Sequence, residues 1–256
     1  MNKVALITGS TSGIGLGIAE AFAKAGYNIM FHGLETEGDK IAKSVGDKYN
    51  VKVSFSNANL LVADEVEGLI ERTIKVFGVL HVLVNNAGIQ YVAPIEDFPN
   101  NKYENIIAIN MNAAFYASKK AWNFMKDQKF GRIINVSSVH GLRASEFKTA
   151  YVTAKHGVIG MTKVLALEGA PYNITCNAIC PGYVKTPLVE GQIKDQAKAH
   201  QMSEEEVVEK VMLKKQAVKQ FVQLETIADM ALLLAKDISS TITGASFALD
   251  GGWSAQ

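Results

Sequence analysis

Cysteine is scarce in this sequence. The two cysteines, Cys176 and Cys180, both lie in the run NITCNAICPG. Four positions apart on an extended strand, they would point to the same side, too far apart along the backbone for an easy disulfide. A metal-binding pair is the alternative, but no cluster of histidine or cysteine completes such a site. We therefore expect two small buried thiols and no metal.

An excess of charge is missing as well. The 26 basic and 25 acidic residues leave a formal net charge of +1, so no general field attracts nucleic acid or an anionic membrane. No apolar run approaches the ~20 residues that a membrane-spanning helix needs. The first residues, MNKVALITGS, enter a strand-like run directly and lack the architecture of a signal peptide. The sequence thus predicts a cytoplasmic protein that binds neither nucleic acid nor membrane.

Internal repeats, low-complexity tracts and linkers are also absent, so we expect one domain spanning residues 1–256. Short β-branched runs alternate with longer segments of helical periodicity. The expected strands are KVALIT (3–8), YNIMF (27–31), VKVSFS (51–56), VLHVLV (79–84), RIINVS (132–137), ITCNAI (174–179) and ASFAL (245–249). Nearly unbroken apolar strands that alternate with helices are typical of a parallel sheet covered on both faces. The sequence therefore predicts an α/β fold, a doubly wound parallel sheet with helices on both faces.

Residues from about 187 to 220 depart from this rhythm, because they contain no strand candidate. SEEE at 203–206 fits a capping box, with Ser203 as the N-cap and Glu206 three residues on. The apolar residues that follow share one helical face: Val207, Val208, Val211 and Met212. Ligands of open α/β sheets bind beyond the carboxyl ends of strands, where this insertion leaves the sheet. We interpret it as a helical substrate lid; a surface excursion and a subunit contact are the alternatives.

Glycines gather in TGSTSGIG (8–15), between the first expected strand and the first expected helix. Gly9, Gly13 and Gly15 permit a tight turn, close backbone approach and tight helix packing. The helix N-terminus then offers free N–H groups and a positive dipole end to a pyrophosphate. The spacing G-x-x-x-G-x-G differs from the common G-x-G-x-x-G, and a purely structural turn is the alternative. In this context the loop predicts a dinucleotide site.

The end of the second strand bears on which dinucleotide binds. This position usually holds an acid for the ribose hydroxyls or a base for a 2′-phosphate, but here Gly33 and Leu34 occupy it. No arginine or lysine lies between Asn28 and Asp39, so a 2′-phosphate would lack a cation. The acid is missing too, unless Glu35 reaches in. We expect NAD, mainly because the cation is absent.

Tyr151 and Lys155 are one helical turn apart and face the same way. A free tyrosine, with a pKa near ~10, is a poor base at neutral pH. A nearby ammonium, together with an oxidised nicotinamide, favours the phenolate. Ser138, at the end of the run RIINVSS, can supply a hydroxyl to the same substrate oxygen. The three residues predict an acid–base centre for an alcohol or a carbonyl.

Taken in order, these motifs resemble the short-chain dehydrogenase/reductase family. The matching segments run along the whole chain and are TGSTSGIG, NNAG (85–88), Asn110 in INMN, Ser138, Tyr151-x-x-x-Lys155 and PGYVKTP (181–187). The resemblance implies a Rossmann-type sheet and hydride transfer to or from a nicotinamide. It also implies that Tyr151 is the general acid/base, that Ser138 polarises the substrate oxygen and that Asn110 holds a water of the proton relay. Lys155 would bind the nicotinamide ribose and lower the tyrosine pKa.

The same resemblance implies a cofactor site drawn from many loops. Its residues are Gly9, Thr11, Ser12, Gly13, Ile14, Gly15, Leu34, Asn59, Leu60, Asn86, Ala87, Gly88, Tyr151, Lys155, Pro181, Gly182, Val184 and Thr186. Val184 would contact the nicotinamide amide through its backbone. Asn59 stands where many members have an aspartate, which puts its adenine contact in question.

Basic residues crowd the stretch before Tyr151. Hydride transfer needs none of them, whereas a substrate carboxylate in a poorly hydrated pocket needs cationic or hydrogen-bonding partners. Lys148 shares a face with Tyr151 if the helix starts early, and His140 points with Ser138 if the preceding strand stays extended. Arg143 we interpret as a surface residue.

The segments VHGL, EFKTAYVTAKHGV, ICPGYVKTPLVEGQI and LDGGW resemble the D-3-hydroxybutyrate dehydrogenases within the family. In those enzymes the residues matching Gln90, His140, Lys148 and Gln192 gather around the substrate carboxylate. The expected substrate residues are Gln90, Ser138, His140, Lys148, Tyr151, Tyr183, Gln192 and Trp253. Tyr183 stands where a tryptophan would also fit, and the alternative for Trp253 is packing or subunit contact.

The leading interpretation is an NAD-dependent enzyme that interconverts (R)-3-hydroxybutyrate and acetoacetate, with a homotetramer implied by the family. One alternative is a dehydrogenase of another small hydroxy acid or of a polyol. A second is a 3-oxoacyl reductase that uses NADPH and a thioester substrate. A third is a catalytically silent binding protein with this fold.

Overall fold

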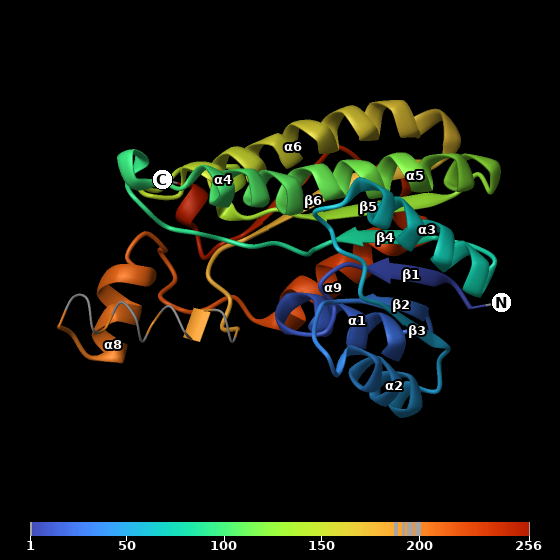
Figure 1. The fold of residues 1–256 in the computed structure, drawn as a ribbon, viewed down its shortest axis with the longest axis horizontal. Helices are drawn as coiled ribbons and strands as arrows, with labels where there is room; N and C mark the ends of the chain where they lie inside the picture. Colours follow the sequence, from blue (N-terminus) through green and yellow to red (C-terminus); the bar gives the residue numbers. More distant parts are fainter. Residues whose placement is uncertain (1, 187–188, 191–192, 194–196, 198–200, 256) are drawn as a thin grey trace.

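Seven short apolar runs become the strands of one parallel sheet, ordered β3-β2-β1-β4-β5-β6-β7 (Figure 1). The computed structural model describes residues 2–186, 189–190, 193, 197 and 201–255. The strands are β1 (Val4–Ile7), β2 (Asn28–His32), β3 (Val53–Ser56), β4 (Val82–Asn85), β5 (Gly131–Val136), β6 (Ile174–Pro181) and β7 (Ser246–Leu249). The strand order reverses between β1 and β4, which is where ligands bind in such sheets. The predicted doubly wound Rossmann-type sheet is confirmed.

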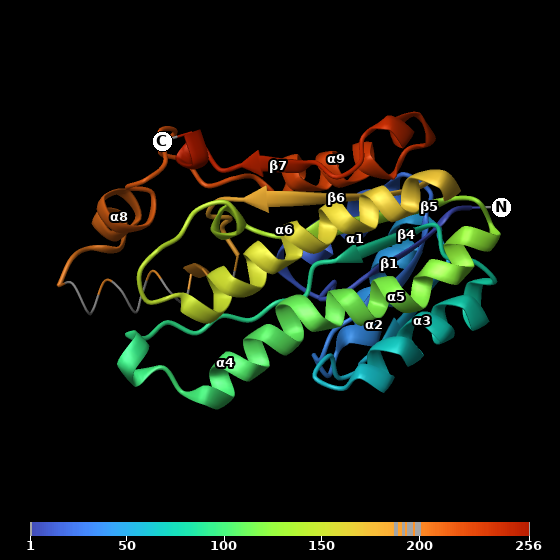
Figure 2. The same cartoon turned by 90° about the horizontal axis from the view of Figure 1, so that it is seen from above.

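Helices cover both faces of this sheet. The helices of the described residues are α1 (Gly13–Lys24), α2 (Gly38–Tyr49), α3 (Ala63–Phe77), α4 (Asn100–Ile107), α5 (Ala113–Asp127), α6 (Thr149–Gly169), α8 (Glu204–Val207) and α9 (Leu224–Ala235). Helices α1, α2 and α9 lie on one face, and α3, α5 and α6 lie on the other (Figures 1 and 2).

The core divides according to the alternation of side chains along each strand. On β1, Ala5 and Ile7 join the cluster formed with α1, α2 and α9, whereas Leu6 joins the cluster formed with α3, α5 and α6. All three are fully buried. Because both faces are covered, a polar residue on either side would be desolvated, which explains the unbroken apolar strands.

The third strand begins two residues later than the sequence predicted. The N–H of Val51 donates to the carbonyl of Gly46 (3.1 Å), and Asn50 before it adopts a left-handed conformation with φ of 53°. Val51 therefore belongs to the turn that ends α2, and pairing starts at Val53.

Buried polar side chains join β4 and β5 to α6. Asn85 Nδ2 donates to Asn135 Oδ1 (2.8 Å), and Asn135 Nδ2 donates to Thr162 Oγ1 (2.9 Å). Asn135 and Thr162 are fully buried. A buried amide that loses its partner costs ~1–3 kcal/mol, so these bonds fix the register between the sheet and the helix that carries Tyr151.

The strands β6 and β7 point toward the lobe that contains α8 (Figure 2). The capping box is confirmed: Ser203 Oγ accepts the N–H of Glu206 (3.2 Å), whose carboxylate accepts the N–H of Ser203 (3.3 Å). Val207 and Met212 are buried in a small apolar cluster with Tyr183 and Phe221. Since Tyr183 belongs to this cluster, the described part of the insertion reaches the substrate site, although its motion as a lid stays a prediction.

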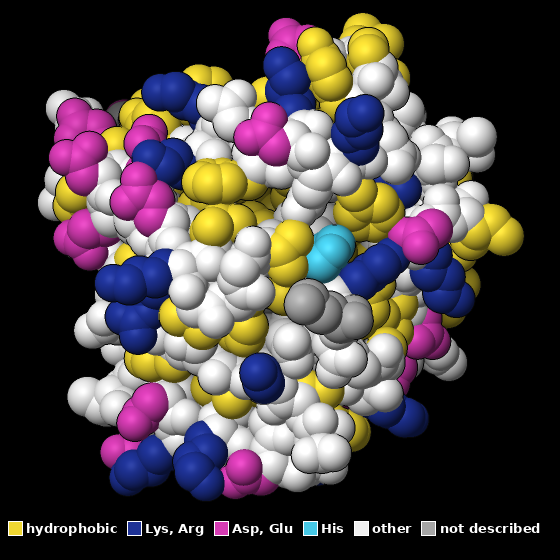
Figure 3. Space-filling view, turned by 90° about the vertical axis from the view of Figure 1, so that its right-hand side faces the viewer, with side chains coloured by type: hydrophobic (Ala, Val, Ile, Leu, Met, Phe, Trp, Pro, Cys, Tyr) yellow, Lys and Arg dark blue, Asp and Glu magenta, His cyan; other side chains and the backbone are white. Residues whose placement is uncertain are grey.

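The sequence also led to expectations about the balance of charge, about membrane-spanning helices and about the two cysteines. On the face at the amino ends of the strands, acidic and basic side chains are interspersed (Figure 3). Among the described helices, none has the length and apolar character needed to cross a bilayer. Cys176 and Cys180 are buried and free, and burial raises the pKa of the two thiols to about 12 and about 11. Both are inert core groups.

Candidate active site

The glycine loop folds so tightly that its backbone contacts itself. A Cβ at Gly15 would lie 2.0 Å from the carbonyl oxygen of Gly9, which itself adopts a left-handed φ of +62°. Asn86 Nδ2 donates to the carbonyls of Thr8 (2.9 Å) and Gly9 (3.1 Å), so the end of β4 holds the loop in place. Ser12 stands at the N-cap of α1 but makes no side-chain cap, which leaves the first N–H groups of that helix to an anion.

A cleft of about 380 Å³ opens above this loop. It is lined by twelve of the predicted cofactor residues, namely Gly9, Thr11, Ser12, Gly13, Ile14, Leu34, Asn59, Leu60, Asn86, Ala87, Gly88 and Thr186. Leu34 exposes 69% of its surface and offers the adenine an apolar contact. Gly15 lies behind the loop, Pro181 is buried in β6, and Gly182 and Val184 line the neighbouring cavity. The glycine cradle and the uncapped helix fit a nicotinamide dinucleotide.

Glu35, which the sequence left open, does reach the cofactor cleft. Its carboxylate accepts hydrogen bonds from the hydroxyls of Thr11 and Ser12. A Cβ at residue 33 would lie 2.1 Å from Thr11 Oγ1, so Gly33 is what allows this contact. Burial raises the Glu35 pKa, but bonds from Thr11, its own backbone, Ser12 and Leu34 outweigh burial and lower it below the ordinary value. The cleft therefore contains a carboxylate.

Asn59 lines the same cleft, but its side-chain oxygen and its backbone N–H already have partners. Its Oδ1 accepts the N–H of Leu61 (3.0 Å), and its own N–H donates to Glu65 Oε2 (2.7 Å). The side chain closes the turn into α3, and its contact with an adenine stays a prediction.

A second cavity, of about 140 Å³, adjoins the cleft at Ile14 and Thr186, which line both. All of the described residues predicted for the substrate line this cavity: Gln90, Ser138, His140, Lys148, Tyr151, Tyr183 and Trp253. Gln192 lies outside the described residues. The sequence analysis did not assign Val139 and Val189, apolar lining residues that lie in two of the segments carrying the resemblance, VHGL and ICPGYVKTPLVEGQI.

Ser138 and Tyr151 share a hydrogen bond at the floor of the cavity. Burial raises the Tyr151 pKa above its ordinary value, and the bond with Ser138 lowers it only in part. Tyr151 therefore carries its proton at neutral pH in the chain alone and stands as an acid toward a carbonyl oxygen.

Lys155 lies beneath Tyr151, with Nζ 5.6 Å from the centre of the phenol ring. The ammonium donates to the carbonyl of Val136 (2.7 Å) and is almost fully buried. Burial lowers the Lys155 pKa to about 8. The expected lowering of the tyrosine pKa by Lys155 does not outweigh burial in this geometry, and the role of Lys155 stays a prediction.

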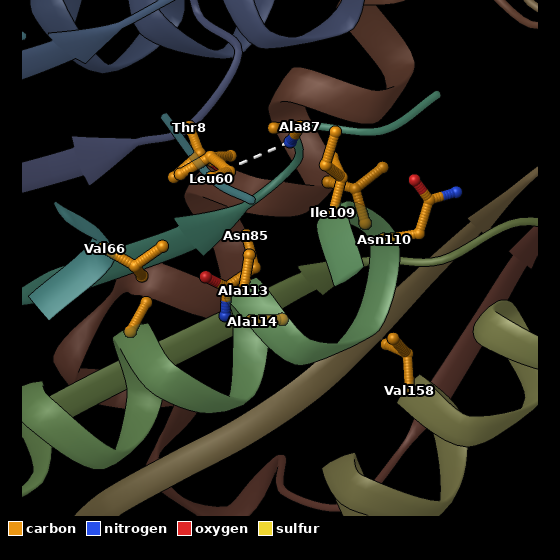
Figure 4. A pocket seen from close by; sticks show the side chains of 12 residues that line it. Thr8, Leu60, Val66, Asn85, Ala87, Ile109, Asn110, Ala113, Ala114 and Val158 are labelled. Atoms are coloured by element: carbon orange, nitrogen blue, oxygen red, sulfur yellow. Dashed lines mark hydrogen bonds between the residues drawn. The ribbon is translucent and has the colours of Figure 1, made fainter. Parts of the chain in front are cut away.

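Asn110 occupies a π-helical turn, Ala108–Asn112, between α4 and α5. Its Oδ1 accepts the N–H of Ile89 (2.8 Å), and its Nδ2 donates to the carbonyl of Ile89 (2.9 Å). Figure 4 shows Asn110 beside the small cavity that Thr8 and Ala87 also line; Thr8 Oγ1 accepts the N–H of Ala87 (3.0 Å). The Asn110 amide thus fixes the loop that carries Gln90, whereas its water-holding role stays a prediction.

Three nitrogen groups of the cavity stand out because each has hydrogen-bonding capacity that the described residues leave wholly or partly unused. Gln90 Nε2 and His140 Nε2 are buried and have no hydrogen-bond partner among the described residues. Lys148 Nζ donates to the hydroxyl of Tyr183 at 3.4 Å, a long bond. Burial, then Lys148, then Lys215 and His156 lower the His140 pKa to about 3, so the ring is neutral. Burial and Lys215 lower the Lys148 pKa to about 8, so at neutral pH the cavity contains a cation, a buried amide donor and a neutral imidazole nitrogen without a partner.

The two conditions that the sequence set for this stretch, an early start of the helix and a continued strand, are not met. Helix α6 begins at Thr149, and Lys148 is a non-helical N-cap (φ −120°, ψ 31°) after Phe147, which adopts a left-handed φ of 65°. The strand before Ser138 does not continue, because a 3₁₀ turn follows in which Ser138 Oγ accepts the N–H of His140 (3.2 Å). This turn is shorter than a continued strand would be, and it still directs the side chains of Ser138 and His140 into the cavity.

Trp253 and Arg143 also have defined places. Trp253 is only 6% exposed and stacks on Tyr183 with ring centres 5.9 Å apart and an angle of 25° between planes. It therefore lines the cavity. Arg143 is exposed, as expected, and donates to the carbonyl of Ser254. No group of three metal-ligating side chains occurs in the part of the chain that the structure describes.

Comparison with known proteins places this geometry in a family. A family model described as short chain dehydrogenase matches residues 3–197. The chain is 46% identical over 258 residues to D-beta-hydroxybutyrate dehydrogenase of Rhizobium meliloti (strain 1021), with 100% of each chain covered. It is 44% identical to D-beta-hydroxybutyrate dehydrogenase of Cupriavidus necator, with 99% of this chain and 98% of the relative covered.

Solved structures agree. A crystal structure of an actinorhodin polyketide ketoreductase with NADPH superposes with a TM-score of 0.93 at 28% identity, covering 100% of this chain and 98% of that one. The fold, the cofactor cleft and the full-length relatives all indicate the same family. The chain belongs to the short-chain dehydrogenase family of nicotinamide-dependent oxidoreductases.

Proposed function

We propose that the protein is an NAD-dependent dehydrogenase that interconverts (R)-3-hydroxybutyrate and acetoacetate. The observation that carries this proposal is a set of nitrogen groups in the reaction cavity: Gln90 Nε2 and His140 Nε2, which have no partner among the described residues, and the Lys148 ammonium, which makes one long hydrogen bond. The names of the full-length relatives in Rhizobium meliloti and Cupriavidus necator support the same substrate.

Burial of unsatisfied donors has a cost that a carboxylate would remove. Each buried polar group without a partner costs ~1–3 kcal/mol, and a charged one costs more. A carboxylate has two oxygens that accept from several donors at once, and its charge complements Lys148. A neutral polyol would leave the ammonium without a counter-charge. The cavity thus favours a short hydroxy acid over a sugar alcohol.

The geometry suggests how the proton moves. Ser138 and Tyr151 direct their hydroxyls to one point of the cavity, where the reacting oxygen would accept or donate hydrogen bonds. On oxidation, Tyr151 in its phenolate form takes the hydroxyl proton while a hydride leaves the substrate carbon; on reduction, the phenol returns that proton. The nicotinamide supplies the hydride acceptor or donor. Lys155, buried beside Tyr151, would hold the ribose and electrostatically favour the phenolate.

The choice of NAD rests on Glu35. Its carboxylate, bound to Thr11 and Ser12, stands where the cleft would otherwise receive a 2′-phosphate. No lysine or arginine occurs among the described residues that line the cleft. A dianionic phosphate there would face a like charge and lack a cation, whereas neutral ribose hydroxyls can donate to the carboxylate.

A second candidate is reduction of a 3-oxoacyl thioester with NADPH. The close superposition on a polyketide ketoreductase that was crystallised with NADPH favours it. Glu35 in the cofactor cleft and the cationic floor of the small reaction cavity count against it. Assembly as a homotetramer, which the family resemblance implies, and a cytoplasmic location, which the sequence predicts, remain proposals; the assembly is checked by the solution mass.

The enzyme is expected to form NADH from (R)-3-hydroxybutyrate with NAD, and to leave the (S) enantiomer and NADP almost unused. Absorbance at the reduced-nicotinamide band, measured for both enantiomers with both cofactors, tests this. Reduction of acetoacetyl-CoA by NADPH without any turnover of 3-hydroxybutyrate would replace the proposal with the second candidate.

Tyr151→Phe removes the hydroxyl and keeps the ring. We expect kcat to fall at least about 100-fold, the scale of general acid–base catalysis. NADH affinity, measured by fluorescence titration, should stay within about twofold, a difference of ~0.4 kcal/mol, because the phenol ring is kept. Tyr103→Phe, on the partly exposed surface of α4, is the matched control. A mutant that retains a tenth of the activity would contradict the role of Tyr151.

Lys148→Met removes the cation that would meet the carboxylate. We expect the substrate KM to rise about 10- to 100-fold, as for loss of a hydrogen bond to a charged group, while the KM for NAD is unchanged. Lys163→Met, exposed on α6, the helix that Lys148 precedes, is the control.

The same variant gives a pH signature. Because the Lys148 pKa is lowered to about 8, its charged form prevails below pH 8. The wild-type substrate KM should therefore be low below pH 8 and rise above it. Lys155 titrates in the same range, so any rise that persists in Lys148→Met belongs to Lys155. A flat wild-type profile through pH 9 would speak against the carboxylate contact.

Glu35→Gln keeps the shape and the acceptor oxygen but removes the charge. We expect kcat/KM with NADP to rise about tenfold, the scale of one screened like-charge contact, with a smaller fall for NAD. Glu37→Gln, exposed two residues further on, should leave the ratio of the two cofactors unchanged. An unchanged ratio in Glu35→Gln would remove Glu35 from the cofactor argument.

A further inference from the structure

The aromatic wall of the reaction cavity is built from two loops that have little regular structure of their own. Tyr183 follows β6 and Trp253 follows β7, and their rings stack on each other. His140 contacts the edge of Trp253, with ring centres 5.3 Å apart. The positions of these rings decide how much room remains above Ser138 and Tyr151.

A third segment ties these two loops together. We call residues 213–222, which lead from the lobe of α8 back to α9, the return strap. The N–H of Val222 donates to the carbonyl of Tyr183 (2.8 Å), and the N–H of Val218 donates to the carbonyl of Gly251 (2.9 Å). The return strap thus forms backbone bonds with both loops.

The side chain of Gln216 has hydrogen bonds to the wall and to the return strap at the same time. Its Oε1 accepts the N–H of Tyr183 (3.3 Å), while its Nε2 donates to the carbonyls of Val218 (3.2 Å) and Gln220 (2.9 Å). It is only 1% exposed. A primary amide has one acceptor and two donor hydrogens, so its capacity matches these three partners.

The backbone on both sides is shaped to admit this amide. A Cβ at Gly182 would lie 3.0 Å from Gln216 Oε1, and a Cβ at Gly251 would lie 2.9 Å from Nε2. Gly251 also adopts a left-handed φ of +62°. The two loops therefore approach the amide as closely as glycine permits, and Gln216 fills the slot between them.

We propose that Gln216 is a positioning residue that holds the Tyr183–Trp253 wall against the reaction cavity and thereby sets the length of hydroxy acid that fits. It acts through Tyr183 and Trp253, since it does not itself line the cavity. Without the amide, the N–H of Tyr183 would be buried without a partner and the wall would be free to move outward. The role in chain-length choice rests on the proposed hydroxy-acid substrate, whereas the positioning of the wall does not.

The test compares Gln216→Met, which fills the slot without hydrogen bonds, with Gln220→Met, the same substitution at an exposed position of the return strap. For Gln216→Met we expect the KM for (R)-3-hydroxybutyrate to rise about tenfold, equal to ~1.4 kcal/mol. The preference for 3-hydroxybutyrate over 3-hydroxyhexanoate should shrink several-fold. The kcat and the NADH affinity should stay within about twofold, and Gln220→Met should match the wild type.

A substrate-independent readout separates this inference from the proposed function. The chain has two tryptophans, so Trp122→Phe leaves the fluorescence of Trp253 alone. In that background, Gln216→Met should raise the acrylamide quenching constant of Trp253, and Gln220→Met should not. If the wild type fails to oxidise 3-hydroxybutyrate, the proposed function fails, but the quenching comparison still tests the positioning.

Gln216→Asn guards against a variant that does not fold. It keeps an amide but withdraws it by one methylene, so we expect the same changes at a smaller size. A folded Gln216→Asn or Gln216→Met with wild-type KM, length preference and quenching overturns the proposal. A parallel loss of substrate and NADH binding overturns it as well, because that pattern marks a general structural role.

Discussion

The site depends on one constraint, the parallel alignment of the strands. Because all seven strands run the same way, every loop that leaves a carboxyl end arrives at the same edge of the sheet. The glycine loop follows β1, Glu35 follows β2, Gln90 follows β4, Ser138 follows β5, and the aromatic wall follows β6 and β7. A slip of one residue between two strands would turn inward side chains outward. The buried pair Asn85–Asn135 counters such a slip where it would matter most.

Parallel strands were readable from the sequence because burial on both faces leaves a simple trace, the unbroken apolar run. The glycine loop was readable for a similar reason, since steric exclusion at Gly15 leaves only one residue type. Glu35 and Gln216 were not readable. The reach of Glu35 depends on Thr11 from another loop and on the missing side chain of Gly33. The side chain of Gln216 accepts a hydrogen bond from Tyr183, which is distant in the sequence. Such contacts are properties of the assembled fold.

The path by which Lys148 enters the cavity could not be read from the sequence either, because it too depends on contacts of the assembled fold. Periodicity placed it on the face of α6, but the left-handed Phe147 redirects the chain, and Lys148 enters the cavity from an N-cap. The carbonyl of Phe147 accepts the N–H of Ala93 (3.0 Å), which shows that a neighbouring loop helps to hold this unusual conformation. A left-handed aromatic residue is unfavourable by itself and persists only where surrounding contacts determine it. Here its effect is to aim a cation into the reaction cavity.

The two halves of the site differ in charge, and this contrast explains why one small fold can order two anionic ligands. The cofactor cleft contains a carboxylate and receives pyrophosphate through backbone N–H groups, so no cationic side chain is needed there. The reaction cavity contains a partly buried lysine and neutral polar groups instead. The proposed carboxylate substrate would be repelled from the first half and attracted to the second, whereas a neutral ribose would be tolerated beside Glu35. Each ligand is thereby directed to its own side of Ile14 and Thr186, the two residues at which cleft and cavity meet.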